Sequence, residues 1–369
     1  MSIKSNKFLR FFGTILAILV LVELGARAGT WVFFKISRTT GCAPFGELCE
    51  FASIYGPIDT PLSLTHNPYL GLDVKPNYKD FDAKRRLAST DSHGFRSKYE
   101  RSKTKDPSRL RILAVGDSFT FGFGANDDET FPAYLETIYE DVEAINAGVL
   151  SFGLDQIYLK AGMLTKEFSP DVLLVGLITH DLVRITTRHY AGRKPVFKKI
   201  DGEWKLTGTP VPTRKERLKR QLPLIIAFPK LQIDILLRPS KSETDETIAE
   251  LSEWLVLQIV REAQELNIRP VFVLMPQRLE LAPTESMGII GKKQYELLHQ
   301  KYELLLQIYN QHQLEYVDLF PEFFELLETH GWQDFETKYL ADLHFSSKGY
   351  EIVAKAVGEY LNLTPVSTQ

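Results

Sequence analysis

The stretch RILAVGDSFTFGFG, residues 111–124, passes from an apolar run into glycine, an acid and a serine. Such a break could bind phosphate, present a nucleophile or form an ordinary loop. A P-loop would need glycine where Phe121 stands, and a dinucleotide fingerprint would need glycine in place of Asp127. The Gly-x-Ser-x-Gly elbow would need glycine at Thr120. The spacing leaves Ser118 in a glycine-rich turn after a strand, near the positive end of the following helix.

The chain after Arg109 alternates short apolar strands with amphipathic helices, a pattern typical of a parallel sheet covered by helices. The predicted strands are residues 112–115, 142–146, 172–177, 271–275 and 316–319. The predicted helical faces lie within residues 131–138, 157–168, 248–266, 295–309 and 350–361. We therefore expect an α/β fold over residues 109–363, a three-layer, doubly wound, flavodoxin-like sheet of about five parallel strands. Ligands of such folds gather at the carboxyl ends of the strands.

Three further regions flank or interrupt this pattern. Residues 29–108 are rich in Pro, Gly, Asp and Asn and predict a loop-rich extension with short strands. Residues 183–244 are an insertion, in which alternation around Asp201-Gly202 predicts a hairpin. Its basic-then-apolar part, 213–239, fits either a solvated turn with a core helix or a surface that contacts a membrane or a substrate. Residues 364–369 are a short tail.

GDSFTFG resembles the first block of the SGNH, or GDSL-type, hydrolases, and the resemblance covers roughly residues 109–363. In that family the serine of this block is the nucleophile, which implies that role for Ser118. The second block resembles NAGVLSFG, residues 146–153, where the family supplies a backbone N–H, usually from glycine; the spacing implies Ser151. The third block reads Gly-x-Asn-Asp in the family, and ITHDL places His180 where asparagine would be.

The last block of the resemblance is YLADLHFSSKGYEIVAKAVGEYL. The family ends with Asp-x-x-His before a final helix, and His344 precedes a helix predicted to begin at Ser346 or Ser347. Ala341 stands three residues before this histidine, and the acid, Asp342, stands two before it. An Asp-x-His variant also occurs among extracytoplasmic SGNH relatives that modify polysaccharides. The resemblance therefore implies His344 as the base and Asp342 as the acid that orients it.

Serine is a weak nucleophile, so a base must take its proton, and a histidine with a pKa near ~6.5 can do this at neutral pH. A carboxylate on the other ring nitrogen fixes the tautomer and stabilises the imidazolium. The oxyanion would be bound by the backbone N–H groups of Ser118 and Ser151 and by the imidazole N–H of His180. Asp117 and Asp181 are expected to support the turns by accepting backbone hydrogen bonds. This chemistry needs no metal and no organic cofactor.

These residues favour a serine esterase that removes an acyl group, for example acetyl, from a cell-envelope carbohydrate or lipid through an acyl-enzyme. An O-acyltransferase could use the same site, with a membrane partner that supplies the acyl donor. A catalytically degenerate module that binds glycan or assembly partners is the third alternative, which His180 and Ala341 keep open. The net charge of −3 over 369 residues argues against nucleic acid as a partner.

Residues 1–28 predict a membrane anchor. The run from Phe8 to Ala26 approaches the roughly 20 apolar residues that cross a bilayer, and three basic residues, Lys4, Lys7 and Arg10, lie before or at its start. A cleaved signal peptide is the alternative, because Ala26 and Ala28 could form a processing site.

Two cysteines follow the predicted anchor, and they are the only two in the chain. Cys42 and Cys49 would suit a small disulfide loop in an oxidising compartment, although two free thiols are the alternative. We therefore expect a single-pass membrane protein whose catalytic domain is extracytoplasmic, on the periplasmic or cell-surface side of a bacterial inner membrane.

Overall fold

The computed structural model describes residues 14–15, 17–18, 20–21, 23–25, 63–81, 86–213, 216, 241–282 and 288–367. None of the helices in these ranges is both long enough and apolar enough to cross a membrane. Most of the predicted anchor, both cysteines and nearly all of the basic-then-apolar segment lie outside the described residues. The expectations about them therefore stay predictions.

Five parallel strands form the central sheet: β5 (Leu110–Val115), β6 (Val142–Asn146), β7 (Val172–Leu177), β12 (Arg269–Leu274) and β13 (Tyr316–Asp318). Their order across the sheet is β13-β12-β7-β5-β6. Counted along the chain, this is the 2-1-3-4-5 order of flavodoxin-like folds. β6 and β7 are buried throughout, as expected for strands covered on both faces. The prediction of five parallel strands is confirmed, with every strand end within two residues of its expected place.

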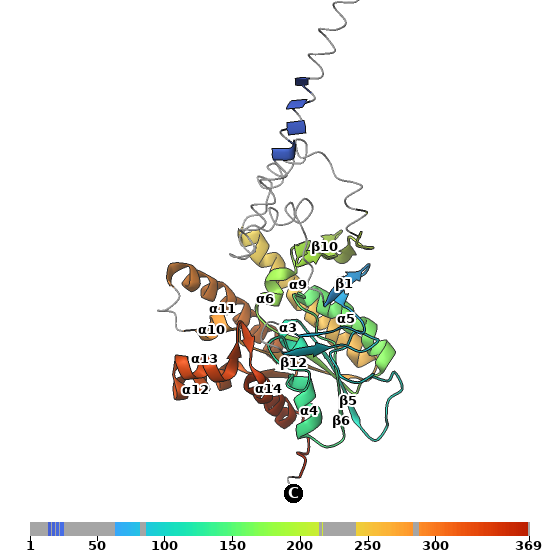
Figure 1. The fold of residues 1–369 in the computed structure, drawn as a ribbon, viewed down its shortest axis with the longest axis vertical. Helices are drawn as coiled ribbons and strands as arrows, with labels where there is room; N and C mark the ends of the chain where they lie inside the picture. Colours follow the sequence, from blue (N-terminus) through green and yellow to red (C-terminus); the bar gives the residue numbers. More distant parts are fainter. Residues whose placement is uncertain are drawn as a thin grey trace, which may run out of the picture.

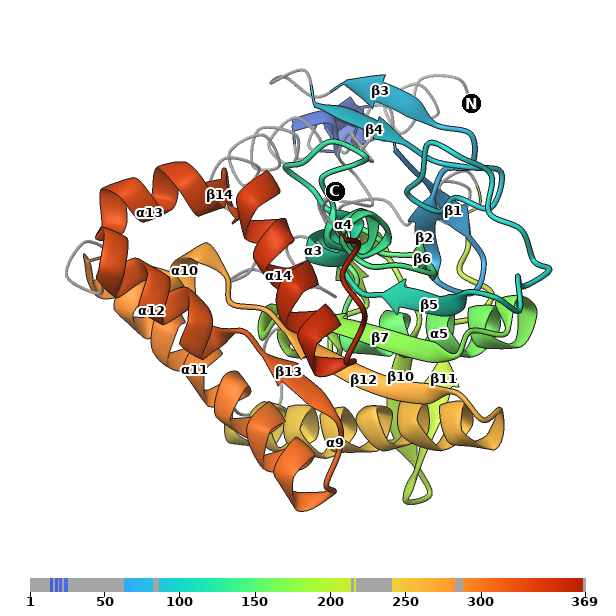
Figure 2. The ribbon, with the colours of Figure 1, turned by 90° about the horizontal axis from the view of Figure 1, so that it is seen from below.

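One face of the sheet is covered by α5 (Leu154–Phe168), α9 (Lys241–Glu265) and α11 (Gly288–Gln311). α5 and α9 lie side by side in both ribbon views (Figures 1 and 2). Their apolar stripes meet the strands in a core that includes Ile157, Leu255 and Leu305. All three helices are among the five that the periodic apolar residues predict.

The opposite face is covered by α4 (Phe131–Ile138), α12 (Phe320–His330), α13 (Trp332–Tyr339) and α14 (Ser347–Tyr360). α4 packs beside α14 (Figure 2). The two covered faces make the domain three-layered. α12 and α13, which follow β13 closely, were not predicted. They meet at Gly331, which has a φ of 72° and caps the end of α12 and the start of α13. Two short helices joined at one glycine leave too little periodic sequence for either to stand out.

The described part of the N-terminal extension contains two hairpins, β1 (Leu64–Asn67) with β2 (Gly71–Val74), and β3 (Lys79–Phe81) with β4 (Leu87–Ser89). Leu70 and Phe95, which are fully buried, join the same core as α5. The described part of the extension therefore packs into the α/β domain.

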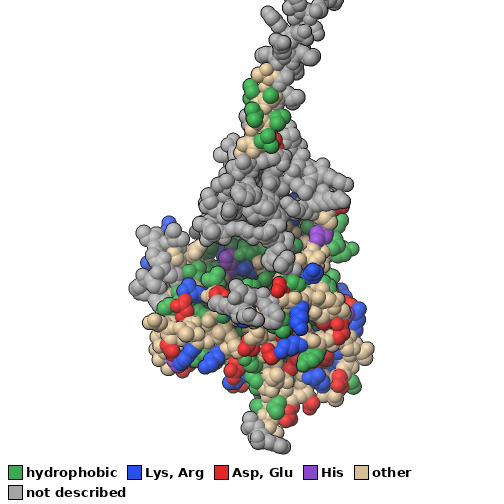
Figure 3. Space-filling model, viewed as in Figure 1, with side chains coloured by type: hydrophobic (Ala, Val, Ile, Leu, Met, Phe, Trp, Pro, Cys, Tyr) green, Lys and Arg blue, Asp and Glu red, His purple; other side chains and the backbone are tan. Residues whose placement is uncertain are grey.

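The insertion contains the predicted hairpin, made of β10 (Val196–Ile200) and β11 (Glu203–Thr207). Its turn has positive φ at both central residues, 55° at Asp201 and 83° at Gly202, as two-residue hairpins prefer. The short strands β8 (His189–Tyr190) and β9 (Gly192–Arg193) lie in the same insertion. On the face shown in Figure 3, acidic and basic side chains are intermixed over the domain without a large patch of one sign.

Candidate active site

The loops after three neighbouring strands carry the residues that the sequence singled out as nucleophile and oxyanion donors. Ser118 follows β5 and begins the short helix α3 (Ser118–Phe121). Ser151 follows β6, and His180 follows β7 as the first residue of α6 (His180–Arg184). Because β5 lies between β6 and β7, the three loops emerge at one edge of the sheet. This is the switch point at which ligands bind in such folds.

The turn that presents Ser118 is capped by the residue before it. Asp117 is fully buried, and its carboxylate accepts a hydrogen bond from the Phe119 N–H at 2.8 Å. As the first residue of α3, Ser118 has a backbone N–H with no carbonyl partner inside the helix. The turn thus leaves both the hydroxyl and the N–H of Ser118 at the start of the helix.

The imidazole of His344, near the other end of the chain, lies beside Ser118. Its Nε2 lies 2.8 Å from Ser118 Oγ, within hydrogen-bond distance. His344 belongs to β15 (His344–Phe345), which pairs with β14 (Leu340–Ala341) just before α14. The imidazole lies between two phenyl rings, with centroids 4.8 Å from Phe119 and 4.9 Å from Phe123. A hydroxyl and an imidazole in this arrangement can act as nucleophile and base.

Burial lowers the pKa of His344 to about 4, while the negative charge of Asp117 acts in the opposite direction. The imidazole is therefore neutral at neutral pH, which leaves one ring nitrogen free to accept a proton. When the proton arrives, the buried carboxylate of Asp117 favours the imidazolium. The charge of Arg184 opposes that effect.

The structure does not place Asp342 on the imidazole. Its carboxylate accepts a hydrogen bond from Arg86 Nη2 at 3.1 Å. In the part of the chain that the structure describes, His344 Nδ1 is buried without a hydrogen-bond partner. Arg86 also donates to the Gly124 carbonyl at 2.7 Å, so it joins Asp342 to the loop after α3. Sequence reasoning missed Arg86, because nothing local links it to a residue 256 positions away.

The second loop approaches α3 closely. A Cβ at Gly148 would lie 2.2 Å from the Phe121 nitrogen, so only glycine allows this approach. Ser151 has a φ of 67°, a left-handed conformation in which glycine is favoured. Within the described residues, neither the Ser118 N–H nor the Ser151 N–H donates a hydrogen bond. Both are thus available to an incoming oxyanion.

His180 is the candidate for the third oxyanion donor, and it would donate from its side chain. Burial, reinforced by the charge of Arg184, lowers its pKa to about 3. The imidazole is therefore neutral and carries one N–H. Its ring centroid lies 6.0 Å from that of Tyr190, a residue of the insertion. A neutral imidazole can donate a hydrogen bond to a developing oxyanion without adding a full charge to the site.

The two acids expected to support the turns are joined by a residue that the sequence did not reveal. Arg184 Nη1 lies 3.2 Å from the Asp117 carboxylate and 2.7 Å from that of Asp181. Asp181 also accepts a hydrogen bond from the Ile178 N–H at 3.0 Å. Of these two acids, only Asp181, three residues before Arg184, could have been paired with it from helical spacing.

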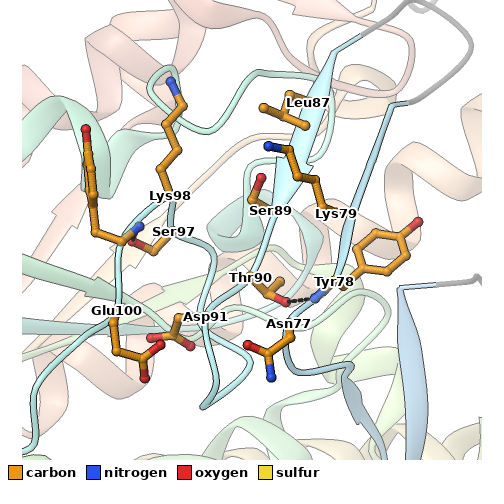
Figure 4. Close-up of a pocket in the computed structure, with 11 residues that line it drawn as sticks. Asn77, Tyr78, Lys79, Leu87, Ser89, Thr90, Asp91, Ser97, Lys98 and Glu100 are labelled. Carbon is orange, nitrogen blue, oxygen red and sulfur yellow. Dashed lines mark hydrogen bonds between the residues drawn. The ribbon is translucent and has the colours of Figure 1, made fainter.

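A separate open cleft lies in the N-terminal extension and contains none of the predicted catalytic residues. It has a cavity volume of about 460 Å³. Figure 4 shows its lining residues, among them Asn77, Tyr78, Lys79 and Ser89, from both strands of the β3–β4 hairpin and the neighbouring loops. Leu87, in β4, lines both this cleft and a neighbouring one. Arg86, which binds Asp342, is the residue just before it.

The described residues contain no group of three or more His, Cys, Asp or Glu side chains that could hold a metal ion. No family model matches the sequence, and no curated protein matches it.

The fold is similar to solved structures of low sequence identity. An acetyl xylan esterase, AlAXEase, is 14% identical, with 68% of this chain and 98% of that chain covered at a TM-score of 0.43. A catalytic mutant of an acetylxylan esterase from Geobacillus stearothermophilus is 17% identical, covering 72% of this chain and 100% of that chain at 0.41. A lipolytic G-D-S-L family member from Veillonella parvula is 12% identical, covering 68% and 96% at 0.39. At these identities and scores, their activities are not transferred to this chain.

The low pKa of His344 predicts the acid limb of the pH profile. We expect kcat/KM for p-nitrophenyl acetate to fall as pH drops through about 4, since the protonated imidazole cannot accept the Ser118 proton. Circular dichroism at each pH checks that the protein stays folded, and Ser118→Ala supplies the background rate. A midpoint near the ordinary histidine value of ~6.5 would contradict the buried environment of His344.

Proposed function

We propose that this protein is a serine ester hydrolase of the SGNH type that uses an acyl-enzyme intermediate. The observation that carries the proposal is the 2.8 Å distance between Ser118 Oγ and His344 Nε2. Two features add support: the neutral state of the imidazole and the two unengaged N–H groups at the same edge of the sheet. No cofactor is part of the proposal.

In the proposed reaction, Ser118 Oγ attacks the ester carbonyl carbon and its proton passes to His344 Nε2. The carbonyl oxygen becomes an oxyanion, which accepts hydrogen bonds from the Ser118 and Ser151 N–H groups and from His180. His344 then returns the proton to the leaving alcohol as the C–O bond breaks. Water repeats the sequence on the acyl-enzyme, releasing the acid and free Ser118.

Asp342 is the proposed orienting acid, although it is bound to Arg86 in this structure. The buried Nδ1 of His344 lacks an acceptor among the described residues, and a buried N–H left unpaired costs about 1–3 kcal/mol. The charge of Asp342 already raises the pKa of His344 slightly against the effect of burial. Catalytic hydrogen bonds often tighten only in the substrate complex. We propose that Asp342 exchanges Arg86 for Nδ1 when substrate binds.

The proposed substrate is an acylated carbohydrate. The cleft in the extension offers amide, ammonium and hydroxyl groups together with the amphipathic rings of Tyr78 and Tyr99, a lining suited to sugar hydroxyls and ring faces. Its strand β4 leads through Arg86 to Asp342 beside His344. We propose that a chain bound in the cleft extends past this hairpin toward the serine. The apolar N-terminal run supports a location at a membrane, with the site outside the cytoplasm, and a lipid ester is the alternative substrate.

Two other functions use the same residues. An acyltransferase would pass the acyl group to a polysaccharide hydroxyl instead of water, with a membrane partner as the acyl source. A binding module would hold glycan without turnover. No observation among the described residues specifically supports either function. The close Ser118–His344 pair favours catalysis over binding alone.

Ser118→Ala is expected to abolish hydrolysis of p-nitrophenyl acetate and labelling by a fluorophosphonate probe, because both need an activated hydroxyl. Ser92→Ala, at an exposed serine that pairs with Glu100, is the control and should keep both. Acetyl transfer to an added glycan that exceeds hydrolysis would identify the transferase. Turnover that persists in Ser118→Ala would contradict the proposal.

Asp342→Asn is expected to lower kcat by roughly 10⁴-fold, the loss typical of a Ser-His-Asp triad without its acid. Asp334→Asn is the matched control: Asp334 is equally exposed and is also ion-paired, at 2.8 Å to Lys338. If Asp342→Asn stays within about threefold of the wild type, while Asp334→Asn behaves likewise, the acid remains with Arg86 and does not orient the base.

Tyr99→Ala is expected to raise KM for an acetylated polysaccharide several-fold and to leave p-nitrophenyl acetate hydrolysis unchanged, because the small ester does not reach the cleft. Tyr99 is 74% exposed, and Tyr69, which is 62% exposed outside the cleft, supplies the control Tyr69→Ala. Equal KM values for both variants would exclude the cleft as the carbohydrate site.

A further inference from the structure

A single arginine nitrogen lies at the centre of the loops that carry the candidate oxyanion donors. Arg184 Nη1 has three acceptors in range: the Phe152 carbonyl at 2.6 Å, the Asp181 carboxylate at 2.7 Å and the Asp117 carboxylate at 3.2 Å. Arg184 lies at the end of α6, and its side chain is 8% exposed. The three acceptors come from the loops after β5, β6 and β7.

Each acceptor belongs to the sequence neighbour of one candidate donor. Asp117 precedes Ser118, Phe152 follows Ser151, and Asp181 follows His180. A shift of the guanidinium would therefore act on the segments that carry all three donors: the backbone N–H groups of Ser118 and Ser151 and the imidazole of His180. Oxyanion donors must lie about 2.7–3.1 Å from the position that the oxyanion will occupy. A group that ties the three loops together controls that placement.

Buried charge, a glycine and an aromatic ring surround the side chain of Arg184. Burial and the charge of Asp117 hold the pKa of Asp181 well above its usual range, and the charge of Arg184 opposes this. Gly153 leaves room for the arginine, since a Cβ there would lie 2.9 Å from Arg184 Cβ. The Tyr190 ring lies 4.7 Å from the guanidinium carbon and covers it from the insertion.

We infer that Arg184 is a positioning residue that sets the three oxyanion donors of Ser118, Ser151 and His180 through one guanidinium nitrogen. The inference rests on the proposed esterase function for its catalytic consequence. Its structural part, that one side chain holds three loops together, does not depend on the function.

Arg184→Lys tests both parts. Lysine keeps the charge, but its side chain is shorter, so its nitrogen cannot reach the position from which Arg184 Nη1 contacts all three acceptors. We expect kcat for p-nitrophenyl acetate to fall by at least about 10²-fold, the loss caused by removing one oxyanion donor, with KM within about threefold of the wild type. We also expect faster hydrogen–deuterium exchange in residues 116–120, 149–154 and 178–182 together.

Arg111→Lys is the matched control. Arg111 is also buried in the same domain and binds Glu143 at 2.8 Å and the Phe168 carbonyl at 2.9 Å, but it lies at the amino end of β5, away from the site. It should lower the melting temperature without lowering kcat or exposing the three segments. An equal loss of kcat in both variants would overturn the inference, because it would show general destabilisation.

Different results would overturn the proposed function and the positioning role of Arg184. If the wild type has no Ser118-dependent turnover, the proposed function is overturned, and the exchange experiment alone decides the positioning role. The positioning role is overturned if the wild type is active but Arg184→Lys keeps the wild-type kcat. It is also overturned if Arg184→Lys speeds hydrogen–deuterium exchange in only one of the three segments. Should Arg184→Lys not fold, Asp181→Asn is the second variant, because it keeps the shape of the acceptor and removes its charge. It should lower kcat by less than about 10²-fold and speed exchange in residues 178–182 alone; unchanged exchange there would overturn the positioning role.

Discussion

The hydrogen bond between Ser118 and His344 is the constraint on which the rest of the site depends. It joins two residues 226 positions apart, one at the end of the first sheet strand and one just before the last helix. The Ser346 side chain caps that helix, and Tyr350 within it donates a hydrogen bond to the Phe123 carbonyl at 3.0 Å. The final helix therefore holds both partners, the hairpin of the base and the loop of the nucleophile.

Buried charge is the second feature that shapes the site. Asp117 and Asp181 are both fully buried, and each would be costly to bury without a partner. Arg184 serves as the common partner of both, which confines the carboxylates to one geometry behind Ser118. The same burial keeps His344 and His180 neutral, so one can accept a proton and the other can donate a hydrogen bond. The electrostatics thus follow from packing more than from the residue types alone.

Much of the fold could be predicted from the sequence because its signals are local. Apolar runs of strand length and helical periodicity located the five strands of the central sheet and the helices α4, α5, α9, α11 and α14, and Asp201-Gly202 located a hairpin. The short helices α12 and α13 could not be found this way, because their pattern is interrupted at Gly331. Among the candidate site residues, the structure brings Ser118 and His344 together, while it pairs Asp342 with Arg86. That pairing links positions far apart in the chain, for which no local pattern exists.

The sequence by itself determined which chemical groups are available: a serine in a glycine-rich turn after the first strand of the sheet, and a histidine before the last helix. It also determined the order of strands and helices along the chain, because local backbone preferences and the periodicity of apolar residues act over a few residues. Only the tertiary structure decided the partners. Arg184 and Arg86 acquire their roles through contacts with residues 67 and 256 positions away, which packing creates and spacing along the chain does not encode.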